Sequence, residues 1–269
     1  MNKQKIYDCI TFFNENLITN TRFEILKNVV DYFVICESNY DHRGKKKKIN
    51  FKLLNQKFKN KVRHIILKKN FLNLEDGWEV ERFQREQLFQ GIIDANENDF
   101  IMYSDSDEIP NPIILKNLKL KKKYGIFLQN FFVYKLNIFN NYESPWEGTR
   151  ICRKKDLKSF SYLRKKILRK NLKKNFLNFS IEKNIQIFDN GGWHFNNLYT
   201  PKGISKKLTT FQHKEFSAKK FSSVHVIKEK ILNLQDLFER GHTYKVVNLK
   251  KFAPEYIWKN KKKFLDWVV

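Results

Sequence analysis

The chain has 269 residues, enough for one large domain or two closely packed lobes, and its 41% hydrophobic and 15% aromatic content argues against an intrinsically disordered protein. Its 53 lysines and arginines against 28 acidic residues give a formal net charge of +25, which calls for an anionic partner such as a nucleotide sugar, an acidic glycan, a membrane face or a nucleic acid. No apolar run approaches the roughly 18 residues that span a bilayer, and no signal peptide fits before the first predicted strand, so we expect a soluble, cytoplasmic protein.

Strands and helices alternate in the first part of the chain. Apolar runs predict strands, and helical spacing of apolar residues predicts helices, over 6–13 (strand), 17–30 (helix), 32–36 (strand), 62–67 (strand), 78–95 (helix) and 100–104 (strand). This order predicts an α/β fold with a mostly parallel sheet flanked by helices. Ligands of such sheets bind beyond the carboxyl ends of the strands, so we expect Asn14, Glu37 and the residues after 104 to converge there.

Two basic elements belong to this first part. The run 42–51 contains four consecutive lysines, and Gly44 permits a tight turn that would aim Lys45 or Lys47 at the same edge, although a lysine run is more often a solvated face. Arg82 and Arg85 lie three residues apart on the helix predicted over 78–95. They either bind the diphosphate or base of a nucleotide, or pair with glutamates of the same helix.

The most informative stretch runs from Phe100 to Pro110, with the sequence FIMYSDSDEIP. Its apolar beginning predicts a buried strand that stops at Asp105, Asp107 and Glu108. These acidic side chains repel one another, and a hard divalent cation relieves that repulsion. Mg²⁺ and Mn²⁺ prefer oxygen ligands and keep positions open for water and substrate phosphates, so the stretch predicts a metal site. The alternative is a solvated acidic turn that caps a helix beginning at Pro110.

The second half is predicted to be less regular. We expect a strand over 125–134, a polar loop over 142–150 around an aromatic residue, and helices over 202–213, 224–238 and from Pro254. The segment 153–174 holds eleven lysines and arginines with one acid, a pattern that would attract anionic lipid head groups or an acidic acceptor. In the stretch 189–195, two glycines would let the backbone approach a ligand and present Trp193 and His194.

Several short blocks follow one another in a characteristic order. They are Tyr7–Cys9, Phe12–Glu15, Val29–Ile35, Glu37–Asn39, Gly44 and Lys45 with Lys47 and Phe51, Trp78 and Glu79 with Glu81–Arg85, Ser104–Pro110, Gly192–Phe195, and Lys207 and Leu208 with Phe211, His213 and Glu215. In this order the blocks resemble glycosyltransferase family 17. The basic segment 153–174 matches nothing in that pattern.

The resemblance implies a GT-A fold, Rossmann-like, in a single domain. Residues 1–110 would form the nucleotide-sugar-binding half, and residues 111–269 the acceptor half with the C-terminal helices. It further implies a nucleotide-sugar donor, a divalent metal ion and inversion at the anomeric carbon. The donor is UDP-N-acetylglucosamine in the enzyme after which the family is named.

The resemblance also suggests roles for individual residues. Asp105 and Asp107 would hold Mn²⁺ or Mg²⁺ against the donor diphosphate, with His194 as a third ligand or a phosphate donor. Inverting transfer needs a carboxylate base, for which Glu147 and Asp189 are the candidates. Candidates for contact with the donor are Asn14, Glu37, Lys45, Lys47, Arg82, Arg85 and Trp193.

We therefore predict a metal-dependent inverting glycosyltransferase that moves N-acetylglucosamine from a nucleotide diphosphate to a glycan or lipid-linked glycan, with peripheral contact to an anionic membrane and no nucleic-acid partner. Two alternatives stay open. A metal-dependent phosphoesterase would use the same acidic edge, with histidine and aspartate ligands for two metals. A basic nucleic-acid-binding protein would explain the charge but gives the acidic edge no purpose.

Overall fold

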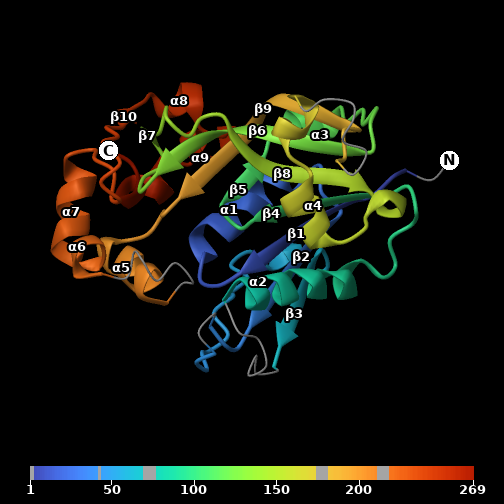
Figure 1. The fold of residues 1–269 in the computed structure, drawn as a ribbon, viewed down its shortest axis with the longest axis horizontal. Coiled ribbons are helices and arrows are strands. Elements are labelled where there is room, and N and C mark those ends of the chain that lie inside the picture. The colour runs from blue at the N-terminus through green and yellow to red at the C-terminus, as the bar shows by residue number, and fades with distance from the viewer. Residues whose placement is uncertain (1–2, 42–43, 69–76, 174–180, 211–217) are drawn as a thin grey trace.

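The computed structural model describes residues 3–41, 44–68, 77–173, 181–210 and 218–269. Its strands are β1 (Ile6–Phe12), β2 (Tyr32–Ser38), β3 (Val62–Leu67), β4 (Phe100–Asp105), β5 (Glu108–Pro110), β6 (Tyr124–Val133), β7 (Ile138–Phe139), β8 (Trp146–Arg153), β9 (Ile185–Asn196) and β10 (Lys245–Val246). Within the described residues they form one ten-stranded sheet in the order β10-β7-β6-β8-β4-β1-β2-β3, from which β9 branches at β6 and pairs with β5 (Figure 1).

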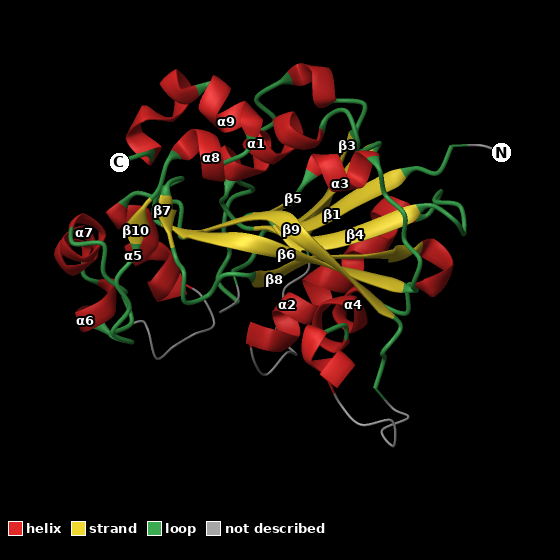
Figure 2. Cartoon of the chain, turned by 90° about the horizontal axis from the view of Figure 1, so that it is seen from above, coloured by secondary structure: helices red, strands yellow, loops and turns green. Residues whose placement is uncertain are grey.

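Helices cover both faces of this sheet. The α-helices are α1 (Asn16–Leu26), α2 (Gly77–Glu86), α3 (Pro112–Lys116), α4 (Phe160–Lys166), α5 (Pro201–Thr210), α6 (Lys219–Ser222), α7 (Val224–Leu232), α8 (Leu249–Phe252) and α9 (Glu255–Lys259). Short 3₁₀ helices are η1 (Gln56–Phe58), η2 (Gln87–Ile92), η3 (Lys154–Asp156), η4 (Arg169–Lys173) and η6 (Lys261–Trp267). Figure 2 shows α1, α3, α8 and α9 on one side of the sheet and α2 and α4 on the other. None of the described helices is long and apolar enough to cross a bilayer.

The predicted parallel half is confirmed. β3, β2, β1 and β4 are parallel neighbours, and each predicted strand of this half is present. Successive side chains of a strand point to opposite faces, and in β1, β2 and β4 the side chains of both faces are buried. In β2, Phe33 and Ile35 join the cluster under α1, whereas Val34 and Cys36 join the cluster under α2. This is the α/β architecture that the sequence predicts, but the sheet as a whole is not mostly parallel, because five of its strand pairs within the described residues are antiparallel and four are parallel.

The second half departs from prediction in two places. Residues 146–153 form strand β8 rather than a polar loop, because they pair with both β4 and β6 in the middle of the sheet, where the charged Arg150 bonds to nearby carbonyl groups. The helix predicted over 224–238 ends at Leu232. Pro110, which the solvated-turn alternative makes the start of a helix, instead ends strand β5, and Asn111 caps the following helix.

The other two predicted helices of this half have observed counterparts. Helix α5 covers the predicted helix as far as Thr210, and the remaining positions 211–213 lie outside the described residues. Pro254 stands at the N-cap of α9, as predicted. The sheet is continuous across the two halves of the chain, and most of its parallel strand pairs lie in the first half.

A buried ion pair joins helix α1 to the sheet. The guanidinium of Arg22 contacts both carboxylate oxygens of Asp8, in β1, at 2.6 Å, and neither side chain has more than 1% of its surface exposed. The same guanidinium donates to Ser104 Oγ at 3.0 Å and to the carbonyl oxygen of Glu108. Arg22, which lies on helix α1, therefore holds the end of β4 and the start of β5 in place.

Removing the charge of Asp8 should expose the cost of this buried arginine. We expect Asp8→Asn to lower the free energy of unfolding by about 3–5 kcal/mol, because an uncompensated charge then lies in the core. Urea denaturation followed by circular dichroism measures the change. The control is Lys220→Ala, which breaks the exposed Lys220–Glu239 pair and should cost less than about 1 kcal/mol. Equal losses in the two variants would contradict the role given to Arg22.

Candidate functional site

The acidic stretch forms a tight connection between two strands of the sheet. β4 ends at Asp105, two residues turn the chain, and β5 begins at Glu108. β5 then pairs antiparallel with β9, which places Glu108 opposite His194. The backbone nitrogen of Phe195 also donates to the carbonyl oxygen of Asp107 at 2.9 Å. Strand pairing, and not local sequence alone, therefore fixes this turn.

A cavity of about 1000 Å³ opens at this turn, beyond the carboxyl ends of β1 and β4. This is the edge at which parallel α/β sheets bind ligands. Four segments supply most of its wall: the end of β1, helix α2, the segment 142–150 and the segment 164–170. Its charged lining residues are Glu15, Glu81, Arg85, Asp105, Asp107, Glu143, Glu147, Arg150, Arg164, Lys165, Arg169, Lys170 and Lys207.

Glu108 is the centre of a polar network at the turn. Its carboxylate is fully buried and accepts hydrogen bonds from Trp146 Nε1 at 2.7 Å, from the backbone nitrogen of Asp105 at 3.1 Å, and from two nitrogens of Arg164 at 2.9 and 3.1 Å. Burial alone would raise the pKa of Glu108, but the neighbouring cations, Arg164 first, lower it overall. Glu108 is therefore an ionised anchor that holds the turn.

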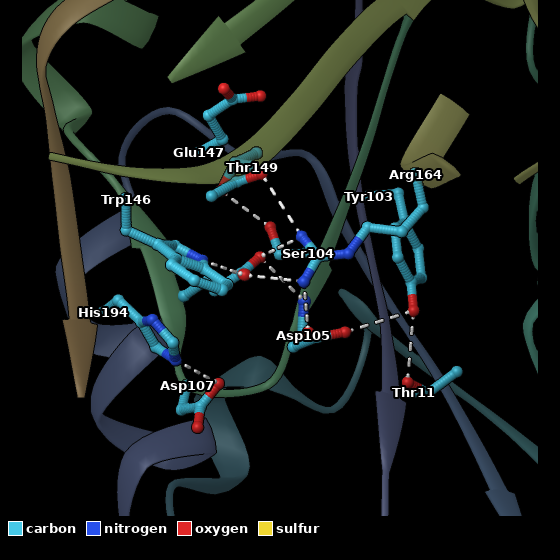
Figure 3. A network of polar contacts seen from close by, with 12 residues as sticks. Thr11, Tyr103, Ser104, Asp105, Asp107, Trp146, Glu147, Thr149, Arg164 and His194 are labelled. Atoms are coloured by element: carbon cyan, nitrogen blue, oxygen red, sulfur yellow. Dashed lines mark hydrogen bonds and ion pairs between the residues drawn. The ribbon is translucent and has the colours of Figure 1, made fainter. Parts of the chain in front are cut away.

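Asp105 faces both this network and the cavity. Arg164 contacts its Oδ2 at 2.5 Å, and Tyr103 Oη donates to its Oδ1 at 3.4 Å (Figure 3). The side chain is 40% exposed and lines the cavity. Burial is the main cause that raises the pKa of Asp105 to about 6, with repulsion from Glu108 added and attraction to Arg164 opposing it. Asp105 therefore changes charge near neutral pH.

Asp107 lies on the other side of the turn, paired with His194. The distance from His194 Nε2 to Asp107 Oδ1 is 3.5 Å. Burial alone would raise the pKa of Asp107, but the charge and hydrogen bond of His194, with Lys207 nearby, lower it to about 2. The two aspartates thus differ in protonation behaviour although they are two residues apart.

The family resemblance implies a divalent metal ion. Such an ion fits the residues of the acidic turn if it is shared between their side chains and a substrate. Asp105, Asp107 and His194 supply hard oxygen and nitrogen donors to the same cavity, and His194 Nδ1 has no hydrogen-bond partner in the described part of the chain. Among the described residues, no group of three or more histidine, cysteine or acidic side chains is placed so that it could hold a metal ion. Mg²⁺ and Mn²⁺ are commonly held by one or two carboxylates together with substrate phosphates, which such an open arrangement suits.

The cavity gathers only part of the predicted site. It is lined by Arg85, Asp105, Asp107, Glu147 and His194. The other predicted residues are absent from its lining: Asn14, Glu37, Lys45, Lys47, Arg82, Asp189 and Trp193.

Glu37 and Lys47 form a scaffold beneath a loop. Glu37 is completely buried and accepts hydrogen bonds from Lys47 Nζ at 2.8 Å and from the backbone nitrogens of Asn50 and Phe51 at 2.6 and 3.1 Å. Burial alone would raise the pKa of Glu37, but hydrogen bonds from His64 and Lys47 lower it overall. The carboxylate at the end of β2 therefore organises residues 47–51, and its oxygens do not face the cavity.

Trp193 points away from the site because neighbouring residues of a strand face opposite sides. Its Nε1 donates to the carbonyl oxygen of Phe252 at 2.6 Å, while the adjacent His194 lines the cavity. The glycines before it serve strand packing and not a ligand. Gly192 has a φ of 132°, and a Cβ there would lie 2.1 Å from the carbonyl oxygen of Ile109.

The remaining predicted residues lie at the surface. Asn14, Lys45 and Asp189 are exposed, and Arg82 is 60% exposed at 3.7 Å from Glu79 of its own helix. For Arg82 the structure thus favours the ion pair with a glutamate of the same helix that the sequence left open. Arg85 lines the cavity and also pairs with a glutamate of its own helix, Glu81. The family-pattern residues Phe211, His213 and Glu215 and the first two residues of the basic run 42–51 lie outside the described residues.

Glu147 lies on the cavity wall next to two arginines. Its carboxylate oxygens are 3.5 Å from Arg150 Nη2 and 3.7 Å from Arg169 Nε, and it accepts a hydrogen bond from the backbone nitrogen of Arg169 at 3.0 Å. Figure 3 shows the carboxylate directed away from Asp105 and Asp107. These contacts fix its orientation on the wall.

Arg164 is the site residue that sequence reasoning missed, because it lies in the basic segment that the family pattern left unexplained. Ser159 caps α4 and accepts from the backbone nitrogen of Tyr162, and Phe160 and Leu163 bury one face of the helix. That spacing, a serine followed by apolar residues at helical positions, was the available signal for an arginine at the edge of a buried face.

A carboxylate of α2 ties this helix to α4. Glu86 accepts hydrogen bonds from the backbone nitrogens of Phe160 at 3.2 Å and Ser161 at 2.8 Å, at the start of α4. These nitrogens have no partner within their own helix, so the carboxylate satisfies them. Arg85 and Arg164, one from each helix, therefore line the cavity from a joined pair of elements.

Comparison with known proteins agrees with the geometry. The model of glycosyltransferase family 17 matches residues 1–254. The chain is also similar to the beta-1,4-mannosyl-glycoprotein 4-beta-N-acetylglucosaminyltransferases of Rattus norvegicus and Homo sapiens, each 31% identical over 119 residues, and to that of Mus musculus at 30%. The matched segment makes up 40% of this chain and 22% of the length of each relative.

Solved structures with a similar course of the chain include glucosyl-3-phosphoglycerate synthase from Mycobacterium tuberculosis, at 11% identity and a TM-score of 0.37, covering 71% of each chain. Another is a glycosyltransferase involved in the glycosylation of the major capsid of PBCV-1, at 12% identity and a TM-score of 0.31, covering 69% of this chain and 81% of the other. The family match, rather than these distant folds, carries the classification.

Replacing Arg164 should destabilise the acidic turn. We expect Arg164→Met to lower the free energy of unfolding by about 3–5 kcal/mol, because Glu108 then stays buried without its cation. The matched control is Lys165→Met, which changes an exposed lysine on the same helix and should cost less than about 1 kcal/mol. Urea denaturation at pH 7.5 compares the two. A similar cost in both variants would show that Arg164 does not hold the turn.

Proposed function

The chain belongs to glycosyltransferase family 17, and we propose that it transfers N-acetylglucosamine from UDP-N-acetylglucosamine to a hydroxyl group of a glycan. The proposal covers the donor, the metal ion and inversion of the anomeric carbon. The relatives named N-acetylglucosaminyltransferases support the choice of sugar. The glycan would be free or attached to a lipid, the second form being the one that suits the basic segment 153–173.

One observation carries this proposal: Asp105 and Asp107 line a cavity that also contains an arginine with an unused hydrogen-bond donor. Arg85 is almost completely buried. Its guanidinium already donates to the carboxylate of Glu81 and to Tyr103 Oη, and its Nη1 has no hydrogen-bond partner in the described part of the chain. A buried guanidinium donor without a partner is costly unless an anion supplies one. The diphosphate of a nucleotide sugar provides such an anion.

The roles of the other residues follow from their positions. Asp105 and Asp107, with His194, would hold the divalent ion, which when bound neutralises negative charge that develops on the departing diphosphate. Arg85 would bind the same diphosphate directly. Glu108, which does not line the cavity, and Arg164, which does, would hold Asp105 in position.

The acceptor hydroxyl must lose a proton as it attacks. In the proposed reaction, the bond from the anomeric carbon to the diphosphate oxygen breaks, the bond to the acceptor oxygen forms, and a carboxylate takes the hydroxyl proton. Of the two carboxylates that the sequence suggests as the base, Glu147 lies on the cavity wall and Asp189 is exposed outside it. We therefore propose Glu147 as the base that takes the proton of the acceptor hydroxyl.

The donor and its metal ion can be tested together. We expect UDP-N-acetylglucosamine to bind the wild-type protein in the presence of Mn²⁺ and more tightly than GDP or CMP sugars. Asp105→Ala and Asp107→Ala should each lower UDP release from this donor by about 100-fold to 1000-fold, as expected for losing stabilisation of developing charge. Calorimetry measures binding, and a coupled assay measures UDP release.

The matched control is Asp189→Ala, which removes an exposed carboxylate outside the cavity and should leave both measurements unchanged. Full activity of both Asp105→Ala and Asp107→Ala would refute a metal-dependent transferase. Equal binding of every nucleotide sugar would refute the UDP assignment.

The protonation of Asp105 predicts a pH dependence. With a pKa of about 6, its carboxylate is charged above pH 6 and neutral below it, whereas Asp107, with a pKa of about 2, stays charged. Mn²⁺-dependent UDP binding should therefore weaken by up to about tenfold per pH unit as the pH falls below 6. Calorimetry from pH 5 to 8 tests this. The control is Asp105→Asn, in which this part of the dependence should be absent. Equal slopes in both proteins would exclude Asp105 as its source.

A further inference from the structure

We propose that the ring of Tyr142 is the platform on which a sugar ring of the acceptor stacks. The inference rests on the proposed function and adds a residue that selects the acceptor. Tyr142 lines the cavity and keeps 51% of its surface exposed. An exposed tyrosine on its own is ordinary. Tyr142 differs from an ordinary exposed tyrosine because neighbouring residues fix the position of its ring and of its backbone.

The ring is backed by a second ring. Tyr142 and His242 stack with their centroids 4.1 Å apart and their planes within 2° of parallel. His242 is itself held by its backbone, because its carbonyl oxygen accepts from the nitrogen of Asp236 at 3.0 Å. One face of the tyrosine ring is therefore covered by the imidazole, and the residue lines the cavity with half of its surface exposed.

The backbone under the ring is also fixed. Asn140 is fully buried, and its Oδ1 accepts from the nitrogens of Tyr142 at 3.0 Å and Glu143 at 3.1 Å. Ser144 Oγ donates to the carbonyl oxygen of Asn140 at 2.8 Å and accepts from the nitrogen of Phe131, in β6, at 2.9 Å. The turn between β7 and β8 is thus anchored to the sheet, and the ring it carries is already ordered before a ligand arrives.

A polar group lies beside the platform. The carboxylate of Glu143 also lines the cavity and is held by Arg240 Nη1 at 2.8 Å, while Arg240 Nη2 donates to the buried Asp236 at 2.8 Å. A pyranose has C–H groups on a ring face and hydroxyl groups around its edge. The negative face of an aromatic ring attracts the former, and a carboxylate accepts hydrogen bonds from the latter.

Position in the cavity indicates the acceptor rather than the donor. Nucleotides bind at the carboxyl ends of parallel strands, which here are β1 and β4, next to Arg85 on α2. Tyr142 instead comes from the antiparallel part of the sheet, between β7 and β8. A volume of about 1000 Å³ is at the upper end for small-molecule pockets, so the cavity has room for a second substrate.

The test separates sugar stacking from nucleotide binding. Saturation-transfer NMR measures the binding of four probes, the methyl β-glycosides of mannose, glucose, galactose and N-acetylglucosamine, and calorimetry measures UDP with Mn²⁺. We expect at least one glycoside to bind the wild-type protein and Tyr142→Ala to weaken it by about threefold to tenfold, as for other aromatic contacts. The matched control Tyr142→Phe keeps the ring and should retain binding, and UDP affinity should be equal in all three proteins.

A second variant tests the backing of the ring. His242→Ala leaves the tyrosine in place but removes its support, and we expect a smaller loss of glycoside binding than in Tyr142→Ala. Unchanged glycoside binding in Tyr142→Ala, or no binding of any probe to the wild-type protein, would overturn the proposal. A parallel fall in UDP affinity would assign the platform to the nucleotide and overturn it as well. Glycoside binding that follows Tyr142 while UDP binds to no variant would support the platform and refute the proposed donor.

Discussion

The ion pairs between Arg164 and the carboxylates of Asp105 and Glu108 are the interactions on which this site depends. Acidic side chains that follow one another at the end of a strand repel each other, and a buried carboxylate is tolerated only when cations and hydrogen bonds compensate it. Arg164 reaches the turn from 59 residues further along the chain. Arg22, from helix α1, holds the backbone of the same turn. Two guanidinium groups therefore fix the acidic turn in place.

This arrangement changes how the acidic stretch is understood. Electrostatics predicts from the sequence that a cation must share the carboxylates, and the proposed metal ion is one such cation. The structure supplies another from the chain itself. Because Arg164 takes one oxygen of Asp105 while the rest of that side chain faces the cavity, a metal ion and the arginine would share a single carboxylate. Burial, with repulsion from Glu108, raises the pKa of Asp105 although Arg164 opposes it, whereas His194 and Lys207 overcome the effect of burial and lower the pKa of Asp107.

Sequence reasoning was most successful where the information is local. Apolar runs such as 32–36 and 62–67 predict strands, and the position of Asp105 directly after such a run places it at the ligand-binding edge. Pairing across the sheet is not local, so β8 was mistaken for a loop. The orientation of a side chain cannot be predicted from such local patterns either. Glu37 also lies at the end of a strand, but its carboxylate points toward the loop at 47–51. Arg164 could not be found from charge alone, because it is one of many basic residues in its segment.

The carboxylate of Glu86, which joins α2 to α4, affects how a ligand would be held between the two helices. Ordering two separate elements around a bound anion removes their relative freedom, and that entropic loss weakens binding. Here the helices that carry Arg85 and Arg164 lose this freedom when the protein folds. Anion binding between them therefore carries a smaller entropic penalty than it would in a cleft whose walls come together only around their ligand.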